Sequence, residues 1–291
     1  MKSAPESKLF STNKTLKIRG RLLDLSTPAV MGVLNVTPDS FYDGGRYDND
    51  DALLMQVEKM LEEGATFIDV GAYSSRPGAK DIPPQEELKR AVRAINLALK
   101  RFPEAIISID TFRSDVARAA IQEGASLIND ISAGELDARM FRTVADLDVP
   151  YVAMHMRGNP GTMNTLTSYQ NLLKEITDYF HQKIHTLHLE GIKDIIIDPG
   201  FGFAKTIQQN FALLNDLDYL KILGKPIMVG LSRKATIWKT LGVSPETALN
   251  GTTVLNTIAL LKGISIVRVH DVKEAVETIK LILAMKVKHG Q

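Results

Sequence analysis

Short apolar runs alternate with longer amphipathic segments along almost the whole chain. The apolar runs are rich in β-branched residues, which is typical of strands that are buried on both faces. In the longer segments apolar residues recur every three or four positions, which predicts helices with one buried face. The eight predicted strands are AVMGVLNV (29–36), TFIDVGA (66–72), AIISID (105–110), SLINDIS (126–132), PYVAMHM (150–156), DIIIDPG (194–200), PIMVGLS (226–232) and SIVRVHD (265–271).

The predicted helices follow the strands one by one. They cover residues 51–64, 84–100, 114–124, 137–147, 168–191, 206–224, 247–263 and 272–286. Several end on a glycine, which suits a left-handed C-cap. Eight β-then-α units predict an α/β protein whose parallel sheet closes into a (β/α)₈ TIM barrel. A doubly wound open sheet is the alternative, because the number of strands alone does not close a barrel.

Length and composition favour one domain. The chain has 291 residues, of which 44% are hydrophobic, and no glycine- or serine-rich linker divides it. A (β/α)₈ barrel typically needs about 250 residues. We therefore expect a catalytic barrel over residues 29–291 and an N-terminal extension over residues 1–28. Within the extension, LKIRGRLLDL (16–25) predicts a short β-hairpin that caps the bottom of the barrel.

Charge and cysteine content exclude several classes of function. The formal net charge is +1, so no overall field attracts nucleic acid or an acidic membrane surface. The absence of cysteine excludes disulfides, zinc–thiolate sites and a thiol nucleophile. The N-terminus has no apolar core of signal-peptide length, and no run of about 18 apolar residues offers a membrane span. We expect a soluble, cytoplasmic protein.

Polar side chains stand at the C-terminal ends of all eight predicted strands, where TIM barrels carry their active sites. Any one of these residues has a structural alternative, a cap on a loop or helix, since Asp and Asn favour both positions. The whole set favours convergence on one cleft. Its members are Asn35, Asp69, Asp110, Asn129, His155, Asp198, Ser232, Arg268 and His270.

The kinds of group in this set predict a ligand with two parts. Carboxylate and amide oxygens, as on Asp110, Asn129 and Asp198, suit a planar heterocycle rich in N–H groups. Positive charge comes from Lys234 and Arg268. Three further groups suit an anion, with or without a magnesium ion: Asn35, Arg76 and His270.

Two other patterns carry little weight. The G-x-G at residues 200–202 lacks the third glycine of a dinucleotide-binding loop, because Lys205 stands there. His181, His185 and His188 share one face of a predicted helix at metal-ligand spacing. That helix belongs to the outer wall of the barrel, so we interpret these histidines as a solvated face.

Eight segments, taken in order, resemble the dihydropteroate synthase family, the folate-pathway target of sulfonamides. The resemblance runs from about Val30 to Asp271, and the set of motifs is far more specific than any one of them. The motifs are NVTPDSFYDGG (35–45), SSRPGA (74–79), ISIDT (107–111), INDIS (128–132), MHMRGNPGTM (154–163), DPGFGFAKT (198–206), GLSRK (230–234) and VRVHD (267–271).

The resemblance implies a (β/α)₈ transferase that condenses 6-hydroxymethyl-7,8-dihydropterin pyrophosphate with p-aminobenzoate to give 7,8-dihydropteroate and pyrophosphate. Pyrophosphate leaves first, so its charge must be neutralised and water excluded. The family is commonly dimeric, so we expect a homodimer.

The resemblance also implies a role for individual residues, carried over position by position. Asp110, Asn129, Asp198 and Lys234 bind the pterin, with Met154 and Arg268 packed near the ring. Asn35, as the Mg²⁺ ligand, lies with Arg76, Arg268 and His270 on the pyrophosphate side. Phe203 and Ser232 contact p-aminobenzoate, Asp39 and Phe41 belong to a first mobile loop, and Ser75, Arg76 and Pro77 to a second. Asp110, Lys234, Arg268 and His270 are the expected catalytic residues.

One departure and three alternatives remain. Tyr73, Ser74 and Ser75 stand where the family often has Glu-Ser-Thr, so a role for that glutamate is in doubt here. Pterin-binding methyltransferases share the barrel and the pterin-binding acids but need neither SSRPGA nor VRVHD. A Schiff-base aldolase would use Lys234. A non-catalytic pterin-binding or scaffold protein would bind the ring without turnover.

Overall fold

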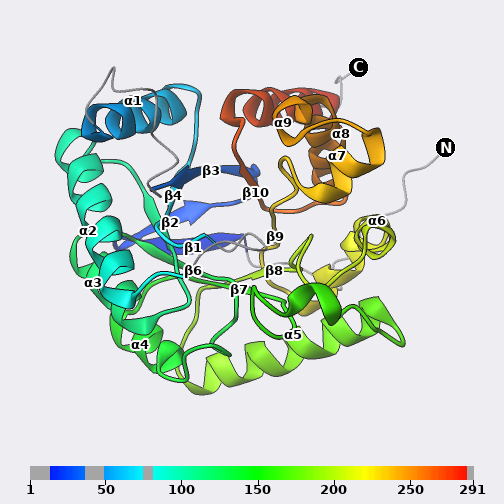
Figure 1. Ribbon diagram of the computed structural model, residues 1–291, viewed down its shortest axis with the longest axis horizontal. Coiled ribbons are helices and arrows are strands. Elements are labelled where there is room, and N and C mark those ends of the chain that lie inside the picture. Colours follow the sequence, from blue (N-terminus) through cyan, green and yellow to red (C-terminus); the bar gives the residue numbers. More distant parts are fainter. Residues whose placement is uncertain (1–13, 37–48, 75–80, 287–291) are drawn as a thin grey trace.

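Eight parallel strands form the centre of the molecule, and helices surround them (Figure 1). The computed structural model describes residues 14–36, 49–74 and 81–286. The sheet order is β8-β7-β6-β5-β4-β3-β10-β9. The strands are β3 (Ala29–Asn35), β4 (Phe67–Gly71), β5 (Ile107–Asp110), β6 (Leu127–Asp130), β7 (Tyr151–Met154), β8 (Ile195–Asp198), β9 (Met228–Val229) and β10 (Ile266–Val269).

The two ends of this sheet meet, so the barrel is closed. Ile197 of β8 forms a parallel bridge with Ile227, and its N–H donates to the carbonyl oxygen of Pro226 at 3.0 Å. This seam is the weakest pairing in the barrel, because β9 contains only two residues. The (β/α)₈ prediction is confirmed, and the open-sheet alternative is wrong.

The helices match the predicted segments with two differences. The segment 206–224 is not one helix, because a 3₁₀ helix (Leu217–Leu223) follows α6. Leu217 and Leu220 are both buried, and a spacing of three places residues on one side of a 3₁₀ turn. An additional helix, α7, follows β9; its seven residues are too few to show a period. The helices are α1 (Asn49–Glu62), α2 (Pro84–Arg101), α3 (Ser114–Gln122), α4 (Met140–Leu147), α5 (Leu172–Leu189), α6 (Ile207–Asn215), α7 (Ala235–Leu241), α8 (Leu249–Leu261) and α9 (Val272–Lys286).

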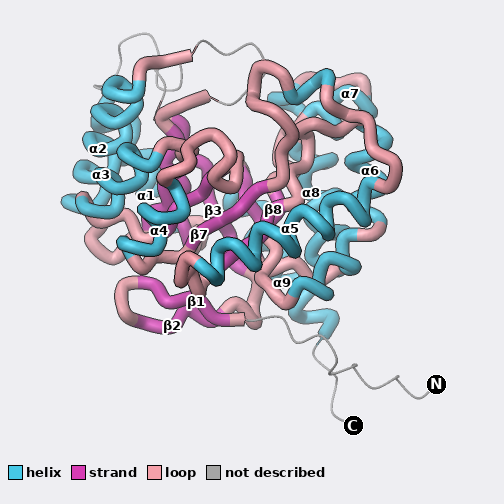
Figure 2. The backbone as a smooth tube through the Cα atoms, turned by 90° about the horizontal axis from the view of Figure 1, so that it is seen from below, coloured by secondary structure: helices cyan, strands magenta, loops and turns pink. Residues whose placement is uncertain are grey.

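A hairpin closes the N-terminal end of the barrel, as predicted (Figure 2). It consists of β1 (Thr15–Ile18) and β2 (Arg21–Asp24), joined at Arg19 and Gly20, which both have positive φ. Leu16 and Ile18 are buried against the side chains at that end of the barrel. The Arg19 side chain donates to Ser126 Oγ and to the carbonyl oxygen of Ala105, both at 2.9 Å. The turn therefore anchors the cap to the barrel wall.

The inside of the barrel is apolar at the hairpin end and polar at the other. Successive side chains of a strand point to opposite faces. In β4, Phe67 packs with the hairpin, whereas Ile68 and Val70 belong to the outer core beneath the helices. Asp69 therefore faces inward, and it meets Asn129 of β6 there. This alternation of side chains along the strand therefore places polar groups inside the C-terminal opening of the barrel.

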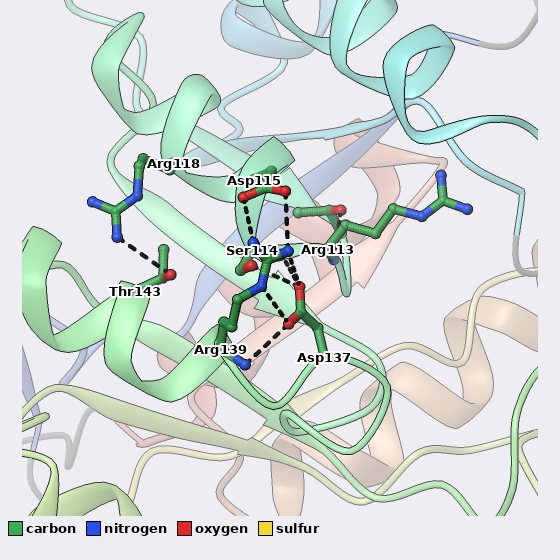
Figure 3. A network of polar contacts seen from close by, with 8 residues as sticks. Arg113, Ser114, Asp115, Arg118, Asp137, Arg139 and Thr143 are labelled. Atoms are coloured by element: carbon green, nitrogen blue, oxygen red, sulfur yellow. Dashed lines mark hydrogen bonds and ion pairs between the residues drawn. The ribbon is translucent and has the colours of Figure 1, made fainter.

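A polar network on the outside joins α3 to the segment before α4 (Figure 3). Asp137 accepts hydrogen bonds from the backbone N–H and Oγ of Ser114 at 2.8 and 2.6 Å. Although burial raises the pKa of Asp137, these bonds and those from Arg139 lower it to about 2. Arg139 also donates to both carboxylate oxygens of Asp115, at 3.1 and 3.0 Å. The network is structural, because it lies on the helical wall.

None of the helices in the described ranges has both the length and the apolar character needed to cross a bilayer.

Candidate functional site

An ion-pair network lies inside the barrel at the C-terminal ends of the strands, the position of the predicted cleft. Arg268 of β10 donates through Nε to Asp69 Oδ2 at 2.6 Å and through Nη2 to Asp110 Oδ2 at 2.5 Å. Asn129 Nδ2 donates to the same Asp69 oxygen at 2.9 Å. Three residues predicted to lie at the pterin, Asp110, Asn129 and Arg268, therefore belong to one network with Asp69. Asp69 was noted at a strand end, but the sequence assigned it no role.

Because these groups are buried, their pKa values depend strongly on the charges of their neighbours. Burial raises the pKa of Asp110 to about 7, although the positive charge of Arg268 opposes the shift. Burial lowers the pKa of Arg268, but Asp69 and Asp110 outweigh it, so the net shift is upward and the guanidinium stays charged. Asp69 is fully buried, and its Oδ1 has no hydrogen-bond partner within the described structure.

Asp198 ends β8 with its carboxylate buried beside this network. Its Oδ1 accepts a hydrogen bond from the N–H of Gly200 at 2.8 Å. Burial raises its pKa, which Lys234 and that hydrogen bond partly oppose. Gly200 has φ +70°, and a Cβ there would lie 2.0 Å from the carbonyl oxygen of His155. Glycine is therefore required for the chain to turn directly after Asp198.

Lys234 brings a positive charge to the edge of the cleft. It stands immediately before α7, and its Nζ donates to the carbonyl oxygen of Phe201. The same Nζ lies 4.8 Å from the centroid of the Phe203 ring, a cation–π distance. Burial lowers the pKa of Lys234 to about 8, with Asp198 opposing the shift. The lysine thus joins the acid at the end of β8 to the aromatic ring beyond it.

Ser232 and His270 lie together beyond the ends of the neighbouring strands β9 and β10. Ser232 Oγ is 3.1 Å from His270 Nδ1 and accepts a hydrogen bond from the His270 backbone N–H at 3.2 Å. The sequence assigned Ser232 to p-aminobenzoate and His270 to pyrophosphate. The direct contact means that the two predicted subsites adjoin at this point.

An apolar cluster stands over the strand ends of β6, β7 and β8. The half-buried rings of Phe112 and Phe203 pack against it. Met154 lies in this cluster, as expected for a residue near a flat ring, and Met156 lies with it. Its buried members are Ile131, Met154, Met156, Met163 and Ala204.

His155 does not join the cleft with the other strand-end residues. Its ring packs edge-on against Tyr179 of α5, with centroids 4.9 Å apart, behind the barrel wall. Burial lowers its pKa to about 2, and the charge of Lys205 adds to this, so the ring is neutral. The expectation was wrong for His155 because it directly follows Met154, and neighbours along a strand point to opposite faces.

Lys205 is a buried functional candidate that sequence reasoning missed. It is 7% exposed, and burial lowers its pKa to about 7. Its Nζ lies 3.0 Å from His155 Nδ1 and donates to the carbonyl oxygens of Gly200 and Phe203, both at 3.0 Å. The available signal was a lysine between Ala204 and a helix cap, in a loop otherwise made of Gly, Phe and Ala.

Tyr73 takes part in a cluster beside the cleft. Its ring packs edge-on against Phe112 at 5.1 Å between centroids, and the Arg113 guanidinium lies 5.2 Å from its centroid. Arg113 Nη1 in turn donates to the fully buried Glu87 at 2.7 Å. Tyr73 therefore packs against an aromatic ring and a guanidinium. It does not supply the carboxylate that a glutamate would bring to this loop.

Some of the remaining residues named from the sequence lie within the described ranges and others outside them. Asn35 is half-buried at the end of β3, opposite Gly71 of β4. The surface histidines of α5 are exposed, and His188 Nε2 lies 2.9 Å from Lys225 Nζ, so their interpretation as a solvated face is confirmed. Five predicted residues lie outside the described ranges: Asp39, Phe41, Ser75, Arg76 and Pro77.

Comparison with known proteins places this site in a family. Residues 31–270 match the family of pterin binding enzymes. The dihydropteroate synthase of Escherichia coli K12 is 40% identical over 272 residues, which cover 91% of this chain and 94% of that protein. The dihydropteroate synthase of Synechocystis is 42% identical over 88% of this chain and 89% of that protein.

Solved structures agree with this assignment. The Yersinia pestis dihydropteroate synthase, in complex with a sulfonamide drug, superposes with a TM-score of 0.88 at 39% identity and covers 94% of this chain and 100% of that one. The Xanthomonas albilineans enzyme in complex with 7,8-dihydropteroate gives a TM-score of 0.84 at 35% identity, covering 94% and 99%. The chain belongs to the pterin binding enzymes and, within them, to the dihydropteroate synthases, transferases of folate synthesis.

Proposed function

We propose that the cleft joins 6-hydroxymethyl-7,8-dihydropterin pyrophosphate to p-aminobenzoate, with the residues around Arg268 and Asp198 in the roles described below. One observation carries this proposal. A set of largely buried hydrogen-bond acceptors, Asp110, Asn129 and Asp198, lies beside an aromatic edge formed by Phe203 and the cation of Lys234. Related structures contain 4-aminobenzoic acid and 7,8-dihydropteroate. 4-Aminobenzoic acid would occupy the aromatic edge alone, and 7,8-dihydropteroate would occupy both parts.

The acceptor set suits the pterin half of the substrate. Asp198 and Asn129 offer buried oxygen atoms to the N–H edge of the ring, and Met154 supplies an apolar face. Asp110 has a raised pKa and a bond to Arg268, so it can respond to charge that develops on the ring. A carboxylate close to the pterin stabilises positive charge there.

The reaction requires a positive environment for the leaving group and none of the nucleophiles used in covalent catalysis. The pterin methylene C–O bond breaks and its electron pair leaves with pyrophosphate, whose charge Arg268 and His270 offset. The amine nitrogen of p-aminobenzoate then forms the new C–N bond and loses a proton to solvent. Phe203 walls the aniline ring, and Ser232 contacts the same substrate. A relative has been solved in complex with a sulfonamide drug, which resembles p-aminobenzoate in shape.

Magnesium chemistry fits the donors that are present. Within the residues that the structure describes, no cluster of three or more His, Cys, Asp or Glu side chains could hold a metal ion. Mg²⁺ commonly takes only one or two protein oxygens and completes its shell with phosphate oxygens and water. The amide oxygen of Asn35 is one such donor, and Gly71 beside it has no side chain to cover it. When bound, Mg²⁺ would neutralise charge on the pyrophosphate.

Removing Mg²⁺ should abolish turnover, and Asn35→Ala should raise the Mg²⁺ concentration needed for half-maximal rate. The reason is that the variant loses the oxygen proposed to hold the ion beside the pyrophosphate. The rate is measured against free Mg²⁺ in chelator-buffered solution. Asn215→Ala, on the outer wall at the end of α6, is the control and should leave the requirement unchanged. Full activity in excess chelator would reject the metal assignment.

The chain is further proposed to act as a homodimer. Apolar side chains on α8 and α9 are exposed along adjoining helices, and a second copy of this chain is the proposed occupant. These residues are Val254, Ile258, Leu261, Leu281 and Met285. The mass in solution, measured by light scattering, tests this. The cytoplasmic location expected from the sequence stays a prediction.

A coupled assay for pyrophosphate release tests the function directly. Release should require both substrates, and the second product should be 7,8-dihydropteroate by mass spectrometry. Release without p-aminobenzoate would indicate a hydrolase, and binding of the pterin without release would indicate a non-catalytic pterin-binding protein. A Schiff-base aldolase would be trapped on Lys234 by borohydride with a carbonyl substrate.

A further inference from the structure

Lys205 fastens the loop that follows β8. Its Nζ has three neighbours at 3.0 Å: the carbonyl oxygens of Gly200 and Phe203 and the Nδ1 atom of His155. A lysine ammonium has three N–H donors, so these acceptors use all of them. The neutral His155 ring leaves Nδ1 able to accept. The side chain therefore connects both ends of the loop Gly200–Phe203 to His155, the residue that follows β7, through charge-assisted contacts.

The loop turns sharply and ends on a residue whose backbone conformation is unfavourable. Gly200 and Gly202 have φ values of +70° and +79°, which glycine adopts freely. Ala204 has φ +49°, and for a residue with a Cβ this conformation is unfavourable. Gly202 is held on its other side, where its N–H donates to Asn210 Oδ1 at 2.8 Å. The side chains of Lys205 and Asn210 therefore hold the loop in this shape.

The opposite side of the loop carries groups of the cleft. The Gly200 N–H donates to Asp198, the Phe201 carbonyl oxygen accepts from Lys234, and the Phe203 ring lies beneath the same lysine. The donors of Lys205 all point to the loop and to His155, away from the proposed substrates. Any shift of the loop would move the Phe203 ring relative to Lys234.

We propose that Lys205 is a positioning residue that holds the Phe203 ring in place, and that it thereby sets the affinity for the aromatic amino acid substrate. The inference rests on the proposed function, in which Phe203 walls the p-aminobenzoate site. The loss of Lys205 should therefore affect one substrate, p-aminobenzoate, and should do so through one side chain, Phe203.

Lys205→Met keeps the length of the side chain and removes its three donors. We expect the KM for p-aminobenzoate to rise by about 10-fold or more, because small misplacements of substrate-positioning groups have large kinetic effects. The Kd for the pterin pyrophosphate, from calorimetric titration, should change by less than about 3-fold, within the context dependence of a distant contact. Assays belong at pH 6.5, below the Lys205 pKa of about 7.

Thr206→Ala is the matched control. Thr206 is the next residue and caps α6 through a bond from the Gln209 N–H to its Oγ1 at 3.2 Å. Loss of the cap destabilises the same region without removing a contact to the loop. The KM for p-aminobenzoate should therefore stay unchanged in this variant. An equal rise in both variants would mean that Lys205 serves stability alone and would overturn the proposal.

A double-mutant cycle with Phe203→Ala gives the decisive test. If Lys205 acts through the ring, Lys205→Met should add nothing to the KM of the Phe203→Ala protein, whereas independent effects would add. Additive effects overturn the proposal. If Phe203→Ala itself leaves the KM unchanged, the substrate assignment of the cleft is at fault instead. Should Lys205→Met fail to melt cooperatively, Lys205→Gln, which keeps two N–H donors, takes its place in the same cycle.

Discussion

Replacing Arg268 with leucine should lower the free energy of unfolding by about 3–5 kcal/mol, the usual effect of stranding a buried charge, and should abolish turnover. The guanidinium is the ionic partner of two carboxylates, and Asp69 is fully buried. Without it, the hydrogen bond from Asn129 is the one that Asp69 keeps within the described ranges. Urea denaturation of the ligand-free protein measures the stability, and pyrophosphate release measures the turnover.

The same experiment contains its own controls. Arg139→Leu removes an exposed arginine whose ion pairs with Asp115 and Asp137 lie on the helical wall, and it should leave the free energy of unfolding almost unchanged. Adding Asp69→Asn to Arg268→Leu should restore much of the stability, since the stranded charge is gone, but none of the turnover. The deficit of Arg268→Leu should also shrink as the pH falls, because burial raises the pKa of Asp110 to about 7 and this carboxylate becomes protonated. Equal losses in the two arginine variants would contradict the buried network.

Asp198→Asn should weaken pterin binding by roughly 10- to 100-fold. The substitution keeps the size and one acceptor but removes the charge, and a hydrogen bond to a charged group contributes about 1.5–3 kcal/mol, with about 1.4 kcal/mol for each factor of ten. Calorimetric titration with the pterin measures the affinity. Asp216→Asn, at the outer end of α6, is the matched control and should leave it unchanged.

Stability of the Asp198→Asn protein separates ligand binding from loop capping. One oxygen of Asp198 does cap the loop, by accepting from Gly200, but an asparagine oxygen can accept the same bond. Burial raises the pKa of Asp198, so its contribution to stability is present at low pH and is lost as the pH rises through the raised pKa. The ligand-free variant should therefore melt at an equal or higher temperature at pH 8, with the difference vanishing near pH 4. Unchanged affinity with a lower melting temperature would establish capping as the only role.

The fold was predictable because its signals are local. Buried parallel strands such as Ile195–Asp198 read as apolar runs, and amphipathic helices show their period within a few turns. The exceptions are short or irregular elements. α7 has too few residues for a period, and the break after Asn215 depends on packing of the next 3₁₀ turn against the barrel.

Sequence position predicted which residues gather at one end of the barrel, but not how they pair there. The strand-end position predicted that Asp110, Asn129, Asp198 and Arg268 lie close together, because the ends of parallel strands meet at one edge. Position along the chain did not show that Asp69 is the carboxylate shared by Arg268 and Asn129. It also misplaced His155. Neighbouring residues along a strand point to opposite sides, so the His155 ring packs against α5.

The sequence by itself determined the strands, most helices, the polar strand ends and the family motifs, since each of these is written in neighbouring residues. Only the tertiary structure decided that the sheet closes through the bridge at Ile197, that Arg268 pairs with two carboxylates, and that Lys205 grips the loop beneath Phe203. These features join residues far apart in the chain: Arg268 and Asp69 are separated by 199 positions. Their energies depend on burial, and burial exists only once the barrel has closed around them.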